Sequence, residues 1–413
     1  MTQIPLLNNV KLYLDDKPSV YGLRQKAKQA LEKTNYPTLK TEAWKYTNIK
    51  AILSGNFKIN TQEHQCSCNC NCHHHDNSSQ IDISFCNGKL HIEEYNLPKG
   101  LSITPLPEIL YEGEYKQYIF NSFNLEEHPF AALNGVYLEQ GVCIHAEKAT
   151  KISQPIYIKY KQSNCSGNQI NIHNLIILEK GAQLEIVELF NSENENKYLT
   201  NIVNEVYLKP DSQLHHYKKQ TESTNSYHIA LNSVRVQNHA SYKQYYLANG
   251  AKICRQETNI QLEQTRAKAE IYSAYTAKKG CLNDITSNIS HLQPETYSNQ
   301  YAKAVLESDS SAVFQGKIHI APLAVKTEGH QLHKALYLND NAELNCKPEL
   351  EIFADDVKCS HGASCGEIDK EQLFYLTSRG ISKTEAIKTL TQAHLNEIIA
   401  LIPNKEIQQE LSL

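Results

Sequence analysis

One phrase recurs along the middle of the chain, and it restricts the fold more than any other feature of the sequence. An apolar residue leads through a polar turn to a small residue and then to a second apolar residue. The copies are LEKGAQL at Leu178, LKPDSQL at Leu208, VQNHASY at Val236, LESDSSA at Leu306 and LNDNAEL at Leu338. Their small residues, Ala182, Ser212, Ala240, Ser310 and Ala342, lie 30, 28, 70 and 32 residues apart, and a looser copy at Ala267 divides the longest interval.

A strand-turn-strand unit with a period of roughly 30 residues is typical of a β-solenoid, in which each coil buries its apolar face on the next. A β-sandwich or meander also has polar turns at short intervals, so the repeat alone leaves both architectures open. Alternating apolar runs indicate strands from about residue 81 to 353, such as QPIYIKY (154–160), NIHNLIILEK (171–180), AEIYSAY (269–275) and GKIHIAP (316–322). No convincing pattern of a long amphipathic helix interrupts them.

The predicted organisation has four parts: a helical N-terminal region (1–60), a Cys/His-rich linker or loop (61–80), a β core (81–366) and a helical C-terminal region (367–413). Asp369 can cap the first C-terminal helix. Ser382 and Glu385 form a capping box for a second helix that reaches Ile402. An apolar stripe on this second helix favours packing on its own domain, and a partner's groove is the alternative. The stripe contains Ile387, Leu390, His394, Ile398 and Leu401.

Composition excludes several classes of function. Lys and Arg number 41 and Asp and Glu 45, for a formal charge of -4, so no global positive field exists to attract nucleic acid or acidic lipid. The chain has neither an apolar run of roughly 18 residues nor a recognisable secretion signal. We therefore expect a cytoplasmic protein without membrane contact. Its 12 cysteines are then expected to be thiols or metal ligands, because the cytosol keeps thiols reduced.

The most conspicuous cluster of metal-binding residues lies in the predicted linker, at Cys66, Cys68, Cys70, Cys72, His73, His74 and His75. Thiolates and imidazoles bind soft metals well. Structural zinc sites, however, usually use C-x(2–4)-C pairs, and no apolar residue near this run would fix its ligands. A low-complexity loop that picks up metal adventitiously is the simpler interpretation. A metal-binding or metal-storage protein built on this loop is the alternative function.

A second cluster lies near the C-terminus, in PELEIFADDVKCSHGASCGEIDKEQLFYLTSRGIS (348–382). It reads as a strand, then a turn that holds His361 between Cys359 and Cys365, then a capped helix. If Cys359 and His361 lie on a strand, their spacing of two puts them on one side, as a shared metal would require. A buried cysteine beside a turn-stabilising histidine is the plainer interpretation of an isolated C-x-H motif.

The run FADDVKCSHGAS, followed by LFYLTSRGIS, closely resembles the C-terminal signature of the SufD family, subunits of the SUF iron–sulfur cluster assembly scaffold. The resemblance extends to FQGKIHIAP (314–322), to LYLNDNAELNCKPELEIF (336–353) and to WKYT (44–47). It implies a mainly β fold, a right-handed parallel β-helix flanked by small helical regions. The paralogous SufB family has an acidic E-H-E element where this chain has KCSHGAS. It also has a cysteine in a stretch where this chain has none, between Cys281 and Cys346.

The resemblance implies a non-catalytic scaffold subunit that pairs with SufB through the β-helices and docks the ABC-type ATPase SufC, which would supply the ATPase activity. In isolation a homodimer is a further expectation. A nascent iron–sulfur cluster, or iron entering the complex, would be held at the SufB–SufD interface by His361, with Cys359 as a weaker candidate ligand. SufC docking would use Asp369, Leu373, Phe374, Tyr375, Arg379, Gly380, Ile387, Leu390 and Ile398.

Three features depart from the family pattern. Cys365 stands where the family commonly has valine, and it is either a buried replacement or an added ligand. His394 stands where a large apolar residue is usual, and the loop from Cys66 to His75 has no counterpart. A β-helix carbohydrate enzyme is the remaining rival, and it would require aromatic platforms and a carboxylate in a groove.

Overall fold

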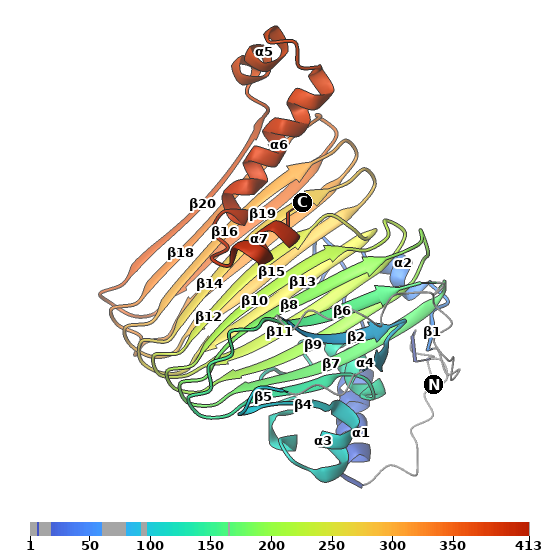
Figure 1. The fold of residues 1–413 in the computed structure, drawn as a ribbon, viewed down its shortest axis with the longest axis vertical. Coiled ribbons are helices and arrows are strands. Elements are labelled where there is room, and N and C mark those ends of the chain that lie inside the picture. The colour runs from blue at the N-terminus through green and yellow to red at the C-terminus, as the bar shows by residue number, and fades with distance from the viewer. Residues whose placement is uncertain (1–5, 8–17, 60–79, 92–96, 164–165, 413) are drawn as a thin grey trace.

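The computed structural model describes residues 6–7, 18–59, 80–91, 97–163 and 166–412. Within these residues the chain is mainly β and forms a β-solenoid of about 7 turns, with small helices near both ends (Figure 1). This confirms the predicted parallel β-helix and excludes the sandwich that the repeat alone had left open. The run from Cys66 to His75 lies outside the described residues.

The strands alternate between two sheets as the chain climbs the solenoid. Sheet A comprises β1 (Lys58–Ile59), β4 (Leu101–Pro105), β5 (Val142–Ala146), β7 (Asn168–Leu178), β9 (Leu199–Leu208), β11 (Tyr227–Val236), β13 (Ile253–Leu262), β15 (Leu282–His291), β17 (Ser311–Ile320) and β19 (Glu343–Ile352). Sheet B comprises β2 (Ile81–Cys86), β3 (Lys89–His91), β6 (Ile156–Gln162), β8 (Gln183–Ser192), β10 (Gln213–Thr221), β12 (Ser241–Ala248), β14 (Lys268–Ala277), β16 (Tyr297–Leu306), β18 (Glu328–Tyr337) and β20 (Lys358–Glu367).

Neighbouring strands of the stacked coils pair in parallel, and their register sets the length of each coil. Tyr227 pairs with Ile253, and Ser311 pairs with Glu343, so from β5 onward equivalent positions lie as few as 26 and as many as 32 residues apart. Antiparallel pairs occur at the start of the solenoid, between β2 and β3 and between β4 and β5. Alternate residues of each strand point between the sheets, so the register fixes which side chains form the core.

The turns show that the recurring phrase comes from both edges of the solenoid. Ala182, Ser212, Ala240 and Ala267 lie in turns from sheet A to sheet B, whereas Ser310 and Ala342 lie in turns from sheet B back to sheet A. The copies look like one series in the sequence because either edge needs a tight polar turn that returns to a strand. The interval between Ala267 and Ser310 therefore spans about one and a half coils.

A regular column of left-handed residues follows the edge that leads from sheet A to sheet B. Its members have φ between 54° and 73° and are Ala149, Gly181, Asp211, His239, Arg266, Glu295, Lys326 and Asp356. The N–H of Asp211 donates to the carbonyl of Asn238 in the next coil at 2.9 Å, and the same bond recurs between other turns of the column. Backbone pairing thus continues through the turns as well as along the strands.

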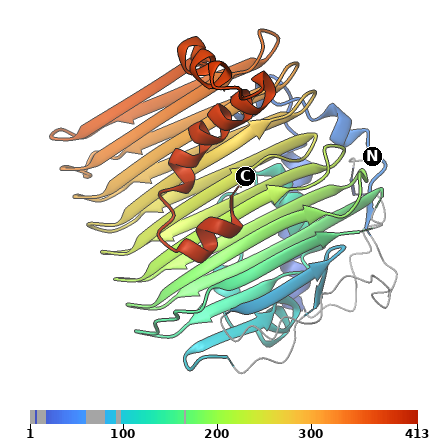
Figure 2. The same cartoon turned by 45° about the horizontal axis from the view of Figure 1, so that its top comes forward.

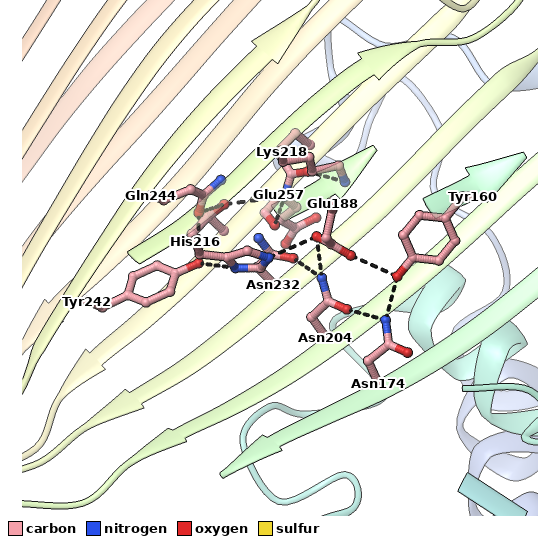
Figure 3. A network of polar contacts seen from close by, with 12 residues as sticks. Tyr160, Asn174, Glu188, Asn204, His216, Lys218, Asn232, Tyr242, Gln244 and Glu257 are labelled. Atoms are coloured by element: carbon pink, nitrogen blue, oxygen red, sulfur yellow. Dashed lines mark hydrogen bonds and ion pairs between the residues drawn. The ribbon is translucent and has the colours of Figure 1, made fainter. Parts of the chain in front are cut away.

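Polar side chains run through the interior of the solenoid as well as apolar ones (Figure 3). Asn174, Asn204 and Asn232 occupy the same position on β7, β9 and β11, and each neighbouring pair is joined by an amide hydrogen bond of 2.9 Å. Asn204 also donates to Glu188 at 3.0 Å, and His216 lies 2.9 Å from the same carboxylate. Burial opposes ionisation of Glu188, but His216 and neighbouring groups hold its pKa at about 2.

Helices near the N-terminus cover the outer face of sheet A (Figure 1). They are α1 (Pro18–Thr34), α2 (Lys50–Leu53), α3 (Leu106–Glu112) and α4 (Pro129–Tyr137), with short 3₁₀ turns η1 (Glu42–Trp44) and η2 (Lys116–Tyr118). Trp44 stacks on Phe130 of α4 with ring centroids 5.5 Å apart, and the Arg255 guanidinium lies 4.0 Å from the Trp44 ring centre. Trp44 of the WKYT motif therefore packs between helix α4 and sheet A.

Two of these helices, α3 and α4, lie inside the range from residue 81 to 353, where the sequence pattern indicated strands. Residues Pro129 to Val136 of α4 are all buried. Because the helix is covered on every side, its sequence lacks the polar face that makes a helix recognisable from periodicity.

The chain ends in helices, of which the second and third lie across the outer face of sheet B (Figure 2). They are α5 (Lys370–Ser378), α6 (Lys383–Ile399) and α7 (Lys405–Glu410). The caps follow the prediction: Asp369 accepts from the N–H groups of Glu371 and Gln372, and Ser382 with Glu385 forms the capping box. His394 is half-buried and makes a polar contact of 3.4 Å with the Lys334 carbonyl, so α6 packs here without an apolar residue.

The buried residues in the second half of α6, together with Ile407 of α7, belong to the chain's own core. Leu395, Ile398 and Ile399 pack with α7 residues against Tyr217 and Tyr245 on the outer face of sheet B. Ile398 is 0% exposed. By contrast, α5 projects beyond the last coil (Figure 1) and has no buried residue.

We expect Asn204→Ala to lower the free energy of unfolding by about 1–3 kcal/mol, because it removes the central amide of the ladder and leaves buried polar groups without partners. Denaturant unfolding would measure the change. Asn288→Ala, at an exposed position on β15, is the matched control and should change stability little. Equal losses in the two variants would mean that the ladder contributes nothing specific.

We expect Ile398→Ala to lower the free energy of unfolding by about 2–5 kcal/mol, because it opens a cavity between α6 and sheet B. Phe374→Ala on α5 removes a side chain that is 73% exposed and should stay within about 0.5 kcal/mol of the parent chain. Thermal and urea unfolding of both variants would test this. A stable Ile398→Ala variant would contradict the packing of α6.

Candidate functional site

The solenoid finishes in an open end, formed by β19 of sheet A and β20 of sheet B. Each strand has a paired neighbour on one side only within the described part of the chain, β17 for β19 and β18 for β20. The backbone groups along the other edge of both strands are therefore available for pairing. Most side chains that would be buried in the middle of the solenoid are here half-buried or exposed.

The CSHGASC segment forms strand β20, where the sequence analysis expected a turn. Cys359 to Cys365 pair in parallel with Gly329 to Ala335 of β18. The nearby glycines, Gly362 and Gly366, do not take positive φ values. Parallel pairing with the coil beneath holds the segment extended, although its composition is poor in residues that favour strands.

The register also fixes which side chains of β20 face the interior of the solenoid. Cys359 and His361 pair with Gly329 and Gln331, which lie on the buried face of β18. They therefore point to the same side, as their spacing predicted. His361 is exposed because no described coil covers it, whereas Cys359 is half-buried in an apolar cluster with Leu350. Burial raises the pKa of Cys359.

Two further thiols lie at the open end. Cys365 is on the inner face of β20 in register with Ala335, and it is exposed rather than a buried replacement for valine. Cys346 is on the inner face of β19 in register with Phe314. Burial and the nearby Cys365 together raise the pKa of Cys346 to about 11. No local motif marks Cys346 as a site residue; its register with the buried Phe314 identifies it.

These groups do not form a complete metal centre within the chain. Among the described residues, no three His, Cys, Asp or Glu side chains come together closely enough to hold a metal ion. His361 and Cys359 can supply at most part of a ligand set, and the rest would have to come from another molecule. The predicted cluster from Cys66 to His75 cannot be placed, because it lies outside the described residues.

The residues predicted to dock a partner fall into three groups. Phe374 and Tyr375 on α5 are 73% and 57% exposed, and Asp369, Arg379 and Gly380 are exposed around them. The Arg379 guanidinium lies 4.9 Å from the centre of the Tyr375 ring. Leu373, Ile387 and Leu390 are half-buried. Ile398 is fully buried inside the chain's own core, so we leave it out of any docking surface.

An exposed apolar patch beside the open end was missed by the sequence analysis. Leu323 and Val325, in the turn between β17 and β18, are 70% and 37% exposed. Ile352 and Phe353, where the chain leaves β19, are 41% and 61% exposed. The signal was present in APLAVK and EIFADD, where apolar residues replace the polar residues of the other turns. Exposed apolar residues gathered at one place favour an interaction surface.

A groove of about 1010 Å³ lies between the N-terminal layer and the outer face of sheet A. It bears on the rival interpretation of a carbohydrate enzyme. Burial opposes ionisation of Glu257 in this groove. His128, at 3.0 Å, and Arg255 nevertheless hold the pKa of Glu257 at about 2. A carboxyl group in that state cannot donate a proton as a general acid near neutral pH. Trp44 is 5% exposed and offers no open aromatic platform. The groove therefore does not favour glycoside hydrolysis.

Two family models match this chain. One is described as the SufBD core domain of SUF system FeS cluster assembly and covers residues 160–394. The other is the SufBD protein N-terminal region and covers residues 8–158. The core match contains most of the solenoid coils and the whole open end.

Curated relatives match over nearly the whole chain. Protein ABCI7, chloroplastic, of Arabidopsis thaliana is 28% identical over 94% of this chain and 84% of its own length. The iron-sulfur cluster assembly protein SufD of Escherichia coli is 26% identical over 93% of this chain and 89% of its own length. An iron-sulfur cluster assembly SufBD family protein of Synechocystis is 25% identical, with 94% and 88% covered. The chain belongs to the SufBD family of the SUF system, which takes part in iron–sulfur cluster assembly.

Proposed function

We propose that this chain is a non-catalytic scaffold subunit of the SUF complex, which pairs with the paralogue SufB through the open end of its solenoid and docks the ATPase SufC. His361, with Cys359 as a weaker ligand, would hold iron or a nascent iron–sulfur cluster between the two subunits. The observation that carries the proposal is the exposed imidazole on the inner face of a last coil whose strand edges are unpaired in the described residues.

Pairing with a second solenoid is supported by the two free strand edges. β19 and β20 are each 10 residues long, so a partner with strands in the same arrangement could continue both sheets by backbone hydrogen bonds. The apolar patch around Leu323 and Phe353 lies at the same end and would add buried area to such an interface.

A shared site at this interface fits the incomplete ligand set. Iron and iron–sulfur clusters are held by soft thiolates supplemented by imidazole. His361 and Cys359 provide one of each, and a facing subunit would have to provide the others. A site divided between two subunits can be opened or closed by moving them, and ATP-driven closure of SufC would supply that movement.

Docking of SufC is supported by the exposed side of α5. Phe374 and Tyr375 present large aromatic surfaces that nothing in the described residues covers. Aromatic side chains and arginine are the residues that most often dominate binding energy at interfaces, and Arg379 lies beside Tyr375.

Location in the cytoplasm stays a prediction. No helix among the described residues is both long and apolar enough to cross a bilayer.

We expect His361→Ala to lower the yield of assembled cluster severalfold, while the complex with SufB and SufC still forms, because the substitution removes a ligand and leaves the strand pairing intact. Cluster absorbance after reconstitution of the purified complex would measure this. His330→Ala is the matched control, since this histidine faces outward from the neighbouring strand and contacts Ser360. A normal yield from His361→Ala would remove His361 from the mechanism.

Removal of the aromatic pair on α5 should weaken binding of SufC. We expect the double variant Phe374→Ala, Tyr375→Ala to lose about 2 kcal/mol or more of binding free energy, or about thirtyfold in affinity. Titration calorimetry with purified SufC would measure it. Tyr111→Ala serves as control, because this tyrosine is 45% exposed but lies on α3, near the opposite end of the solenoid. Unchanged affinity in the double variant would place the docking surface elsewhere.

A further inference from the structure

Cys346 and Cys365 both lie on the inner side of the open end, near the same edge of the solenoid. In each coil the chain runs out along a strand of sheet A and returns along a strand of sheet B, so the end of β19 that begins at Glu343 lies opposite the end of β20 that finishes at Glu367. Cys346 and Cys365 lie near these ends, and both are on inward-facing positions.

The coil beneath shows the surroundings of these positions. Phe314 stacks on His333, the inward residue before Ala335, with ring centroids 4.8 Å apart, so Cys346 lies at the level of Ala363 and Cys365 lies one inward position farther along β20. Phe314 and Ala335, the register partners of Cys346 and Cys365, are 2% and 5% exposed. They belong to one hydrophobic cluster, and Cys346 packs against it. The same geometry one coil higher brings the two sulfur atoms toward one space. The effect of Cys365 on the pKa of Cys346, noted above, agrees with this placement.

This thiol pair is separate from the site around His361. Cys365 is four residues beyond His361, which is about 13 Å along an extended strand. Cys359 lies farther still and packs into a different apolar cluster, with Leu350 and Val357. One metal ion bound by both Cys346 and Cys365 could not also be bound by Cys359 without bending the strand.

We propose that Cys346 and Cys365 form a two-thiolate binding site for a thiophilic divalent cation such as Fe²⁺ or Zn²⁺. Sulfur ligands select such ions over Mg²⁺ and Ca²⁺, and two thiolates provide half of a tetrahedral set. Cys365 is exposed and Cys346 half-buried, so an ion can enter from the open end. Each thiol loses its proton to solvent as its bond to the metal forms, and no electron is transferred.

The use of this site rests on the proposed function. In a scaffold that assembles clusters at His361, a dithiolate about 13 Å away would hold iron close to the point of assembly. The remaining coordination positions would be filled by water or by groups of the delivering molecule. This agrees with the finding that no third described ligand lies within reach.

Titration of the isolated full-length chain with Co²⁺ tests the site. Replacing Cys66, Cys68, Cys70 and Cys72 with serine first removes the other thiol cluster. The probe is the near-ultraviolet charge-transfer absorption of thiolate-bound Co²⁺, which histidine and carboxylate ligands do not produce. We expect one equivalent of Co²⁺ to give the band, and both Cys365→Ser and Cys346→Ala to lose it.

Cys359→Ser is the matched control and should keep the band, because this cysteine belongs to the other end of the strand. Cys365 is exposed on the last strand, so its replacement tests the site even if Cys346→Ala fails to fold. A band that survives Cys365→Ser, or one lost in Cys359→Ser, would overturn the assignment. Such a result leaves the scaffold role standing, which the His361 test judges independently in the assembled complex.

Discussion

Parallel register between successive coils is the constraint on which the rest of this structure depends. Each coil is paired with its neighbours along both strands, and the left-handed column from Ala149 to Asp356 extends the pairing into the turns. Because side chains alternate strictly, the register of one coil decides which residues of the next point inward. The inner faces of β19 and β20, which carry the candidate ligands, are thus determined by the coils below them.

Local sequence signals predicted much of this architecture. The period of roughly 30 residues, the capping box at Ser382 and the cap at Asp369 are short-range patterns with direct physical causes. The left-handed column was invisible because only Gly181 among its eight members is a glycine. The buried asparagine ladder breaks the usual rule that buried residues are apolar. The buried helix α4 was hidden for another reason, since it lacks the polar face by which a helix is recognised.

The candidate site was predictable only in part, because some of its residues are brought together by the fold and not by a local motif. A motif of consecutive residues drew attention to Cys359 and His361. Cys346 is 13 residues earlier in the sequence than Cys359, and only the return of the chain from β19 along β20 brings Cys365 to the same edge of the open end. The apolar pattern of the C-terminal helices also could not show that Ile398 on α6 is buried within the chain whereas Phe374 on α5 is exposed. Which helix is covered depends on where sheet B ends.

The two ends of the solenoid differ, and the difference limits how many copies can join. At the start, the short antiparallel strands β3 and β4 close the sheets, beside helix α3. A similar solenoid cannot stack there by parallel pairing. Among the described strands, parallel stacking is therefore open at one end only, and an association through that end would occupy it on both molecules. Two chains joined in this way would make a closed pair rather than a fibre, although each is built from the repeating element of a fibre.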